Sequence, residues 1–294
     1  MYYTLDLKVW DRATITPVTN YGVSYDQGTR KYAVSAQGTV PASVLETTDQ
    51  GYLSNYSSRN NGAWRKIGAR TRNSVPLVRY ANGLWFICDS TYISRINVST
   101  GSGTVSTVAG VTFTDVAYDS STERYLFSGS GTVRYTTDFT TFTSVVVGYG
   151  SSPITSVLTV GPANRMVVGG ESVSNARIST SDNGGTSWTN RTVTGTRVRS
   201  LKYLPQLETY VMGNGVGEIF TSSDAITWTK QTATGTGRGI YTVGYSDRLR
   251  VAYGIDDFLR VLVSADGVTW TNNGATTMGW VQSTAITTRG ASVS

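Results

Sequence analysis

Apolar and polar residues alternate along this chain with the short period of β-strands. Two apolar stretches, 116–118 and 125–127, are rich in Val, Tyr, Leu and Phe and are separated by the polar turn 119–124. The same strand, polar turn and strand recur at 243–253, and similar segments begin at Leu77, Leu201 and Tyr21. Such pairs of short strands around a polar turn are typical of antiparallel hairpins.

A short polar phrase recurs after these hairpins. It starts with Ser or Thr, contains an Asp and ends in Trp, and its clearest copies hold Asp182, Asp224 and Asp266, spaced 42 residues apart. Weaker copies hold Asp6, Asn60 and Asp138, and a decayed copy lies near Asn97. A period of about 40 to 50 residues with four short strands per unit is the sequence signature of a β-propeller.

Each repeat predicts a four-stranded antiparallel blade: strand a, polar turn, strand b, loop, strand c, the phrase, strand d. The seven positions predict an all-β, seven-bladed β-propeller, or a six-bladed one if the copy near Asn97 is only a loop. The segment 280–287 has the pattern of a strand a without a phrase, whereas the N-terminus has a phrase and a strand d. We therefore expect a single domain, residues 1–294, whose ring is closed by a blade shared between the termini.

The first full repeat is longer than the others. Asp6 and Asn60 are 54 residues apart, and the excess falls between the expected strands b (32–36) and c (52–56). The segment 37–51 has no clear periodicity, so it is predicted to be an inserted loop between these strands.

The recurring phrase resembles the Asp-box, or BNR, repeat of the sialidase-like β-propeller superfamily. This resemblance implies a structural turn, in which a short Asp or Asn side chain accepts backbone N–H groups and the aromatic residue packs between blades. Asn60 agrees with that role, because an amide can hold a turn but cannot act as a base. The predicted turn residues are Asp6, Asn60, Asp138, Asp182, Asp224 and Asp266, with the aromatic residues Trp10, Trp64, Phe142, Trp188, Trp228 and Trp270.

Charge and composition narrow the possible partners. The net charge is +6, but the 20 Arg and 5 Lys are scattered without three basic residues in a row, so nucleic-acid binding is not expected. No secretory signal and no apolar run long enough to span a membrane is found, which predicts synthesis in the cytoplasm without membrane insertion. The single Cys88 lies in an apolar strand and is expected to be a buried thiol.

The catalytic options are few. The chain contains no His, which excludes Ser-His-Asp and Cys-His catalysis and imidazole metal sites. Carboxylate or Tyr chemistry, as in glycoside hydrolysis, stays possible. The Arg-Ile-Pro signature of sialidases is absent, and the nearest string is Arg12-Ala13-Thr14-Ile15. We therefore expect no catalytic residue, no metal and no cofactor.

A candidate binding face follows from the propeller topology, because the loops from strand d to the next strand a and from b to c lie at the same end of the blades. These loops concentrate both signs of charge. The functional interpretation is a polar pocket for a sugar or a protein partner; alternatively, the charges pair with one another. The candidate residues are Arg70, Arg72, Arg197, Arg238, Asp89, Glu171, Asp256 and Asp257.

The sequence as a whole favours a non-enzymatic structural and interaction protein. A Ser-, Thr-, Tyr- and Gly-rich all-β chain with decayed repeats is typical of a bacteriophage virion component, such as a tail, tail-fibre or capsid-associated protein. Its expected partners are other virion proteins or a host surface, glycan or protein, and its expected location is the virion. The alternatives are a carbohydrate-binding propeller lectin and a sialidase-like glycoside hydrolase.

Overall fold

A computed structural model describes residues 77–272 except for short gaps, together with the backbone of six strands between residues 2 and 69. Regular structure in these residues is almost entirely β-strand, with two short 3-10 turns, η2 (Pro162–Asn164) and η3 (Pro205–Leu207). The gaps are 89–91, 101, 109–112, 130, 148–157, 171–175, 194, 196, 232–236, 248 and 257–259.

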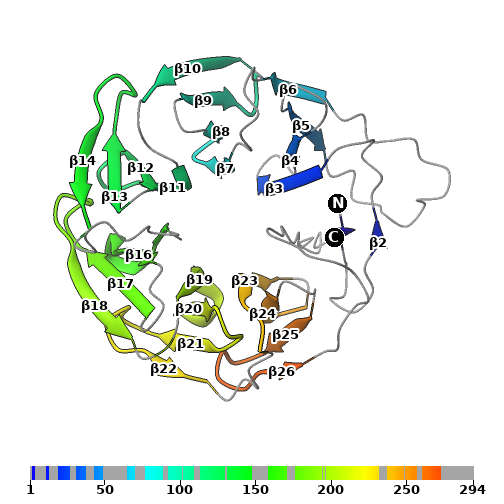
Figure 1. Cartoon of the computed structure of the whole chain (residues 1–294), viewed down its shortest axis with the longest axis vertical. Helices are drawn as coiled ribbons and strands as arrows, with labels where there is room; N and C mark the ends of the chain where they lie inside the picture. Colours follow the sequence, from blue (N-terminus) through cyan, green and yellow to red (C-terminus); the bar gives the residue numbers. More distant parts are fainter. Residues whose placement is uncertain are drawn as a thin grey trace, which may run out of the picture. The chain divides into compact units, whose positions relative to one another are not determined.

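The described strands form six four-stranded antiparallel sheets and one two-stranded sheet, and each four-stranded sheet takes its strands in sequence order (Figure 1). This is the a, b, c, d order that the hairpin pattern predicts, and we use these letters for the four strands of every sheet. The chain divides into two compact units, one built around residues 11–112 and the other around residues 113–282. No described helix is long and apolar enough to cross a membrane.

The first unit holds the two-stranded sheet and two four-stranded sheets. In the two-stranded sheet, Tyr2 pairs with Arg12 on the other side of the segment that contains Asp6 and Trp10. Asp6, Trp10, Asn60 and Trp64 themselves lie outside the described residues. The strands of this unit are β1 (Tyr2–Tyr3), β2 (Asp11–Arg12), β3 (Thr19–Asp26), β4 (Lys31–Gln37), β5 (Ser43–Thr48), β6 (Arg65–Ala69), β7 (Leu77–Ala81), β8 (Leu84–Cys88), β9 (Tyr92–Asn97) and β10 (Gly103–Thr107).

The strands of this unit test the predictions for the segment 37–51 and for the copy near Asn97. The segment 37–51 is not a loop throughout: it contains β5, which pairs with β4 from Lys31–Thr48 to Ala36–Ser43 and also with β6. Strand c therefore comes earlier than predicted. The sequence pattern did not reveal it, because the segment Val44-Leu45-Glu46 is short and follows Pro41 closely. The decayed copy near Asn97 forms a complete four-stranded sheet, β7–β10, rather than a loop.

The second unit holds four four-stranded sheets. Their first strands lie side by side in sequence order, since β11 contacts β15, β15 contacts β19 and β19 contacts β23. The strands are β11 (Phe113–Asp119), β12 (Arg124–Gly129), β13 (Thr132–Thr136), β14 (Thr143–Val146), β15 (Leu158–Val160), β16 (Met166–Gly170), β17 (Ala176–Ser181), β18 (Thr189–Val193), β19 (Val198–Leu204), β20 (Thr209–Asn214), β21 (Ile219–Ser222), β22 (Thr229–Lys230), β23 (Ile240–Ser246), β24 (Val251–Asp256), β25 (Val261–Ser264) and β26 (Thr271–Asn272).

The core of the second unit lies between successive sheets. Strand b is buried along nearly its whole length, so each sheet buries apolar side chains on both faces. Val167 and Ile178 of one sheet pack with Val198 and Leu201 of the next, and Leu204 and Val211 pack with Ile240 and Val243 of the sheet after that. Burial of these apolar contacts holds neighbouring sheets together.

A glycine in strand b lets neighbouring sheets approach closely. A Cβ added to Gly169 would lie 2.6 Å from Val198 Cγ1 of the next sheet, and one added to Gly213 would lie 2.5 Å from Ile240 Cβ. Both glycines are the last but one residue of strand b, and both neighbours are the first residue of the next strand a. The inter-sheet spacing therefore depends on the absence of a side chain at this position.

We expect Gly169→Ala to lower the free energy of unfolding by about 1–3 kcal/mol, because the added methyl group overpacks the contact with Val198. Val198→Ala, which removes two of the contacted atoms, should make the same glycine substitution less costly. Urea unfolding of both single variants and the double variant measures this coupling. Strictly additive effects would show that the two positions do not meet.

Candidate binding face

Each four-stranded sheet has two chemically different ends. Because its strands are antiparallel and connected in order, the a–b and c–d turns lie at one end, and the b–c loop and the d–a connection lie at the other. We call these the turn end and the loop end. The recurring phrase forms the c–d turn, so it lies at the turn end, and the described candidate residues Arg197, Arg238 and Asp256 lie at the loop end.

The c–d turns are held by one side-chain oxygen. Asp224 Oδ1 accepts the N–H groups of Ile226 and Thr227, each at 2.8 Å, and Asp266 Oδ1 accepts those of Val268 and Thr269 at 2.8 and 2.7 Å. Asp138 Oδ1 does the same for residues 140 and 141. A buried hydroxyl at the start of the phrase completes the turn, as when Gly267 N–H donates to Ser264 Oγ at 2.8 Å.

The sheet β7–β10 keeps this turn although its phrase has decayed. Asn97 Oδ1 accepts the N–H groups of Ser99 and Thr100, each at 3.0 Å. The amide therefore replaces the carboxylate at the same place in the turn. No aromatic residue follows it, so the hydrogen bonds alone mark this copy in the structure.

In the sheet β15–β18 the turn residue is Asn183, not Asp182 as the spacing predicted. Asn183 Oδ1 accepts the N–H of Ser187 at 3.0 Å and the hydroxyl of Ser181 at 2.9 Å. The phrase runs Ser181-x-Asn183, in the same order as Ser222-x-Asp224, but one further residue precedes Trp188. The regular spacing of the aspartates pointed to Asp182, which directly precedes the true turn residue Asn183.

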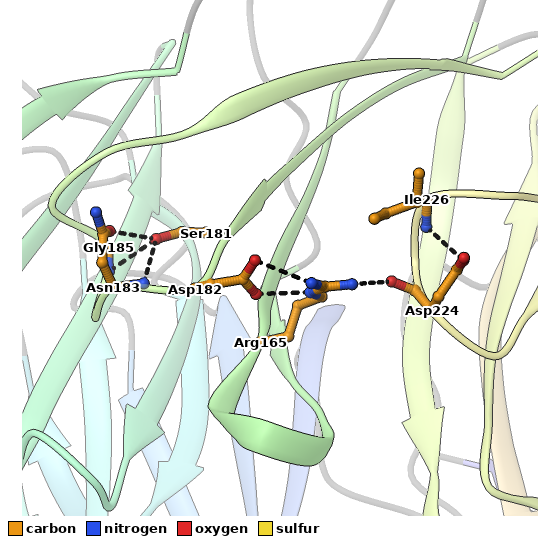
Figure 2. Close-up of polar contacts among 7 residues, drawn as sticks. All are labelled: Arg165, Ser181, Asp182, Asn183, Gly185, Asp224 and Ile226. Carbon is orange, nitrogen blue, oxygen red and sulfur yellow. Dashed lines mark hydrogen bonds and ion pairs between the residues drawn. The ribbon is translucent and has the colours of Figure 1, made fainter.

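Asp182 instead joins two neighbouring sheets through Arg165 (Figure 2). Arg165 Nε and Nη2 donate to the two carboxylate oxygens of Asp182 at 2.6 and 2.9 Å, and Nη1 donates to the backbone oxygen of Asp224 at 2.6 Å. The hydrogen bond from Arg165 lowers the pKa of Asp182, and the same bond raises the pKa of Arg165. One guanidinium thus links the c–d turns of successive sheets.

Arg124 makes a similar link one sheet earlier. Its Nη1 donates to the backbone oxygen of Gly184 at 2.9 Å, and its guanidinium lies 4.4 Å from the ring centroid of Tyr135. Both arginines immediately precede or begin strand b, so they reach the c–d turn of the next sheet from equivalent places. Between the last two sheets Leu207 takes this place, with Cδ1 3.4 Å from the position of a Cβ on Gly267.

The aromatic residue of the phrase closes the turn against the core. Trp188, Trp228 and Trp270 each donate their indole N–H to the backbone oxygen three residues earlier, at 3.1, 3.2 and 3.0 Å. Their rings pack against three successive core clusters. Phe142 has no such donor and contacts Phe127 edge to face at 6.0 Å.

The loop end carries a repeated β-bulge. In four of the six four-stranded sheets the register between strands a and b shifts near the start of strand a, at its second residue in three sheets and at its third in β3. A bulged residue is not opposed in the ladder, and bulges commonly redirect a side chain toward a functional site. The bulged residues are Tyr21, Thr114, Arg199 and Tyr241.

Two of the bulged residues meet across neighbouring sheets. The Arg199 guanidinium lies 5.1 Å from the ring centroid of Tyr241, which is a cation–π contact. Both side chains are half-buried, and Arg197 and the exposed Arg238 lie on the connections that lead into the same two strands. Arg197 is anchored through its backbone oxygen, which accepts the N–H of Gly215 at 3.0 Å. Arg199 and Tyr241 therefore meet at the loop end of β19–β26, and Arg197 and Arg238 lie on connections at the same end.

Asp256 has a structural role in this region. Its carboxylate is buried and accepts Arg260 Nε at 2.6 Å and the Arg260 N–H at 2.9 Å, which closes the b–c loop. Asn214 occupies the same place one sheet earlier and accepts the N–H groups of Val216 and Glu218. Asp256 is therefore paired with another charged side chain, which was the alternative to a role in binding. Arg70, Arg72, Asp89, Glu171 and Asp257 lie outside the described residues.

The sequence analysis named Arg197 and Arg238 as candidates, and it did not name Arg199 and Tyr241. These two residues lie inside predicted strands, where an alternating pattern places them in the ladder rather than at a bulge. Within the described parts of the chain, no group of three His, Cys, Asp or Glu side chains could hold a metal ion.

Comparisons with known proteins address the fold. No protein-family model matches the chain, and no curated protein matches it by sequence. Among solved structures, YCF48 from Cyanidioschyzon merolae is 13% identical with a TM-score of 0.60, covering 92% of this chain and 87% of its own. A structure described as YCF48 bound to D1 peptide is 16% identical with a TM-score of 0.61, covering 92% and 86%.

These neighbours are β-propellers, so the β-propeller fold predicted from the repeat is shown. At such identities the likeness concerns the fold alone. Membership of the Asp-box family, the number of seven blades and the closure of the ring stay predictions.

We expect Asn183→Ala to lower the free energy of unfolding by about 1–2 kcal/mol, since it leaves a turn N–H and a buried hydroxyl without their acceptor. Asp182→Ala should cost less than about 1 kcal/mol, because its ion pair with Arg165 is largely exposed. Denaturant unfolding of both variants measures the difference. The reverse order would restore Asp182 as the turn residue.

The turn carboxylates predict acid sensitivity. The N–H groups of Thr269 and Val268 lower the pKa of Asp266 to about 2. Because the folded pKa lies below the unfolded value of about 4, this group stabilises the fold above pH ~4 and loses that contribution as pH falls toward 2. Asp266→Asn keeps the acceptor without titrating, so its melting temperature should fall less than that of the wild type between pH ~4 and ~2. An equal fall in both proteins would contradict this.

Proposed function

We propose that this chain is a non-enzymatic β-propeller that binds segments of other proteins at its loop end. The observation that carries the proposal is the contact of Arg199 with Tyr241, two bulged residues on sheets that pack side by side, with Arg197 and Arg238 on the connections that lead into the same two strands. The solved neighbour described as bound to D1 peptide supports a protein segment as the ligand class, since that propeller takes a peptide.

The chemistry of these three arginines and the tyrosine suggests a carboxylate on the bound segment. A guanidinium presents donors in a planar fork that matches a carboxylate, and stacking on Tyr241 fixes the plane of Arg199. The tyrosine ring beside it offers an apolar surface for a neighbouring side chain. We infer a segment with an acidic side chain, or a C-terminal carboxylate, next to an apolar residue.

The blade number, the biological setting and the partners are part of this proposal. The count of repeats favours seven blades, and the composition favours a virion protein whose partners are other virion proteins or a host surface. A carbohydrate ligand is the alternative for the same loop end, because sugars also bind to arginine and tyrosine. A panel of fluorogenic sialosides should remain uncleaved by the pure protein, and turnover would overturn the non-enzymatic assignment.

Binding is testable with labelled peptides of about ten residues that carry Glu beside Leu at varied spacing, and a matched set with Gln in place of Glu. We expect fluorescence anisotropy to show binding to members of the Glu set at least about tenfold tighter than to their Gln counterparts. Arg199→Ala should weaken this binding about tenfold, since it removes the stacked guanidinium.

Arg250→Ala serves as the matched control, because Arg250 is an exposed arginine at the turn end of the sheet that contains Tyr241. It should leave peptide binding unchanged. Equal affinity for the two peptide sets, or equal losses in the Arg199 and Arg250 variants, would refute the loop end as a carboxylate-binding surface.

A further inference from the structure

The turn end of the last two sheets exposes apolar side chains. Ile226, Leu249 and Val268 are 37%, 36% and 54% exposed. Ile226 and Val268 stand two residues after the turn aspartate, where the described copies at 138 and 97 have Thr140 and Ser99. The turn itself therefore does not require an apolar residue two positions after its acceptor. Among these four described turns, only those of the last two sheets have one.

This apolar surface continues from one sheet to the next. Leu207 of the a–b turn in β19–β22 packs toward Gly267, which directly precedes Val268 in the next sheet. Gln206 Nε2 donates to Asp247 Oδ1 at 2.8 Å and so joins the a–b turns of both sheets. Leu249 follows Asp247 by two residues.

Acidic side chains predominate on the turns that carry these apolar residues. Glu208, Asp224, Asp247 and Asp266 lie on these turns with Arg250, and Arg165 of the preceding sheet reaches the backbone oxygen of Asp224. Partial burial raises the pKa of Asp224, but the N–H groups of Thr227 and Ile226 outweigh it and lower the pKa overall. The turn aspartates thus stay charged at neutral pH.

The loop end of the same two sheets has the opposite charge among its described residues. It carries Arg197, Arg199 and Arg238, while Asp256 pairs with Arg260 and Glu218 pairs with Lys230. Its apolar groups are Tyr241 and Val216, which is 41% exposed on the b–c loop. Acid with apolar side chains at one end and base with apolar side chains at the other form a complementary pair.

We propose that the turn end of β19–β26 docks onto the loop end of a second copy of this chain. The acidic side chains of one copy then face the arginines of the other, and Val268 and Leu249 face Val216 and Tyr241. Because the two surfaces lie at opposite ends of the same strands, the contact is head to tail and leaves each copy with one unused surface. This inference rests on the proposed function, since it names a second copy as a partner of the loop end.

Two variants separate the surfaces. Leu249→Lys with Val268→Lys alters the turn end, and Arg197→Glu with Arg238→Glu alters the loop end. Sedimentation velocity at about 50 mM salt should show concentration-dependent association of the wild type, with weaker association at about 500 mM salt because complementary charges are screened. Each double variant alone should be monomeric, since neither retains both surfaces.

Mixing the two double variants is the decisive measurement. The loop end is intact in one and the turn end in the other, so an equimolar mixture should form a 1:1 complex that does not grow further. Near-ultraviolet circular dichroism checks that both variants are folded. A monomeric wild type at about 200 μM, association of either variant by itself, or no complex in the mixture would overturn the proposal.

The peptide assay distinguishes this inference from the proposed function. The turn-end variant keeps the loop end, so it should bind the Glu peptides as tightly as the wild type does. Peptide binding without self-association would reject only the head-to-tail contact. Loss of peptide binding in the wild type with intact self-association would reject only the carboxylate segment as ligand.

Discussion

The fold depends on one oxygen atom that accepts two backbone N–H groups in four of the described c–d turns. Asp138, Asp224, Asp266 and Asn97 all place Oδ1 within 3.0 Å of the N–H groups two and three residues later. Each such bond is worth about 0.5–1.5 kcal/mol on its own. Their larger effect is geometric, because they fix where strand c ends and where strand d returns.

Contacts between sheets are built on this fixed turn. The carbonyl oxygens that the turns present accept Arg165 and Arg124 from the preceding sheet, and the tryptophan that ends the phrase packs into the core. These links lie at the turn end, while Gly169 and Gly213 allow close packing toward the loop end. Successive sheets are therefore joined at both ends, which gives the side chains of the proposed binding surface a closely packed support.

The repeat made the order of the strands predictable. It did not make the role of every residue within a repeat predictable. Alternation and spacing led to the a, b, c, d order, and an amide was expected to replace the carboxylate, as Asn97 does. The same spacing failed at Asp182, because an inserted residue shifts the turn by one and places a neighbouring aspartate where the count expects it. The bulges at Arg199 and Tyr241 leave no trace in the hydrophobic pattern, since a bulge depends on the ladder partner.

Tolerance of the repeat explains how the two ends acquired different chemistry. The turn needs its Oδ1 acceptor, but the residue two positions later supplies only its N–H, so Thr140, Ser99, Ile226 and Val268 all satisfy it. A bulge likewise needs only a backbone shift, so Thr114, Arg199 and Tyr241 can occupy it. The structural requirement falls on the backbone, and the side chains at both ends of β19–β26 are left to determine which surfaces bind.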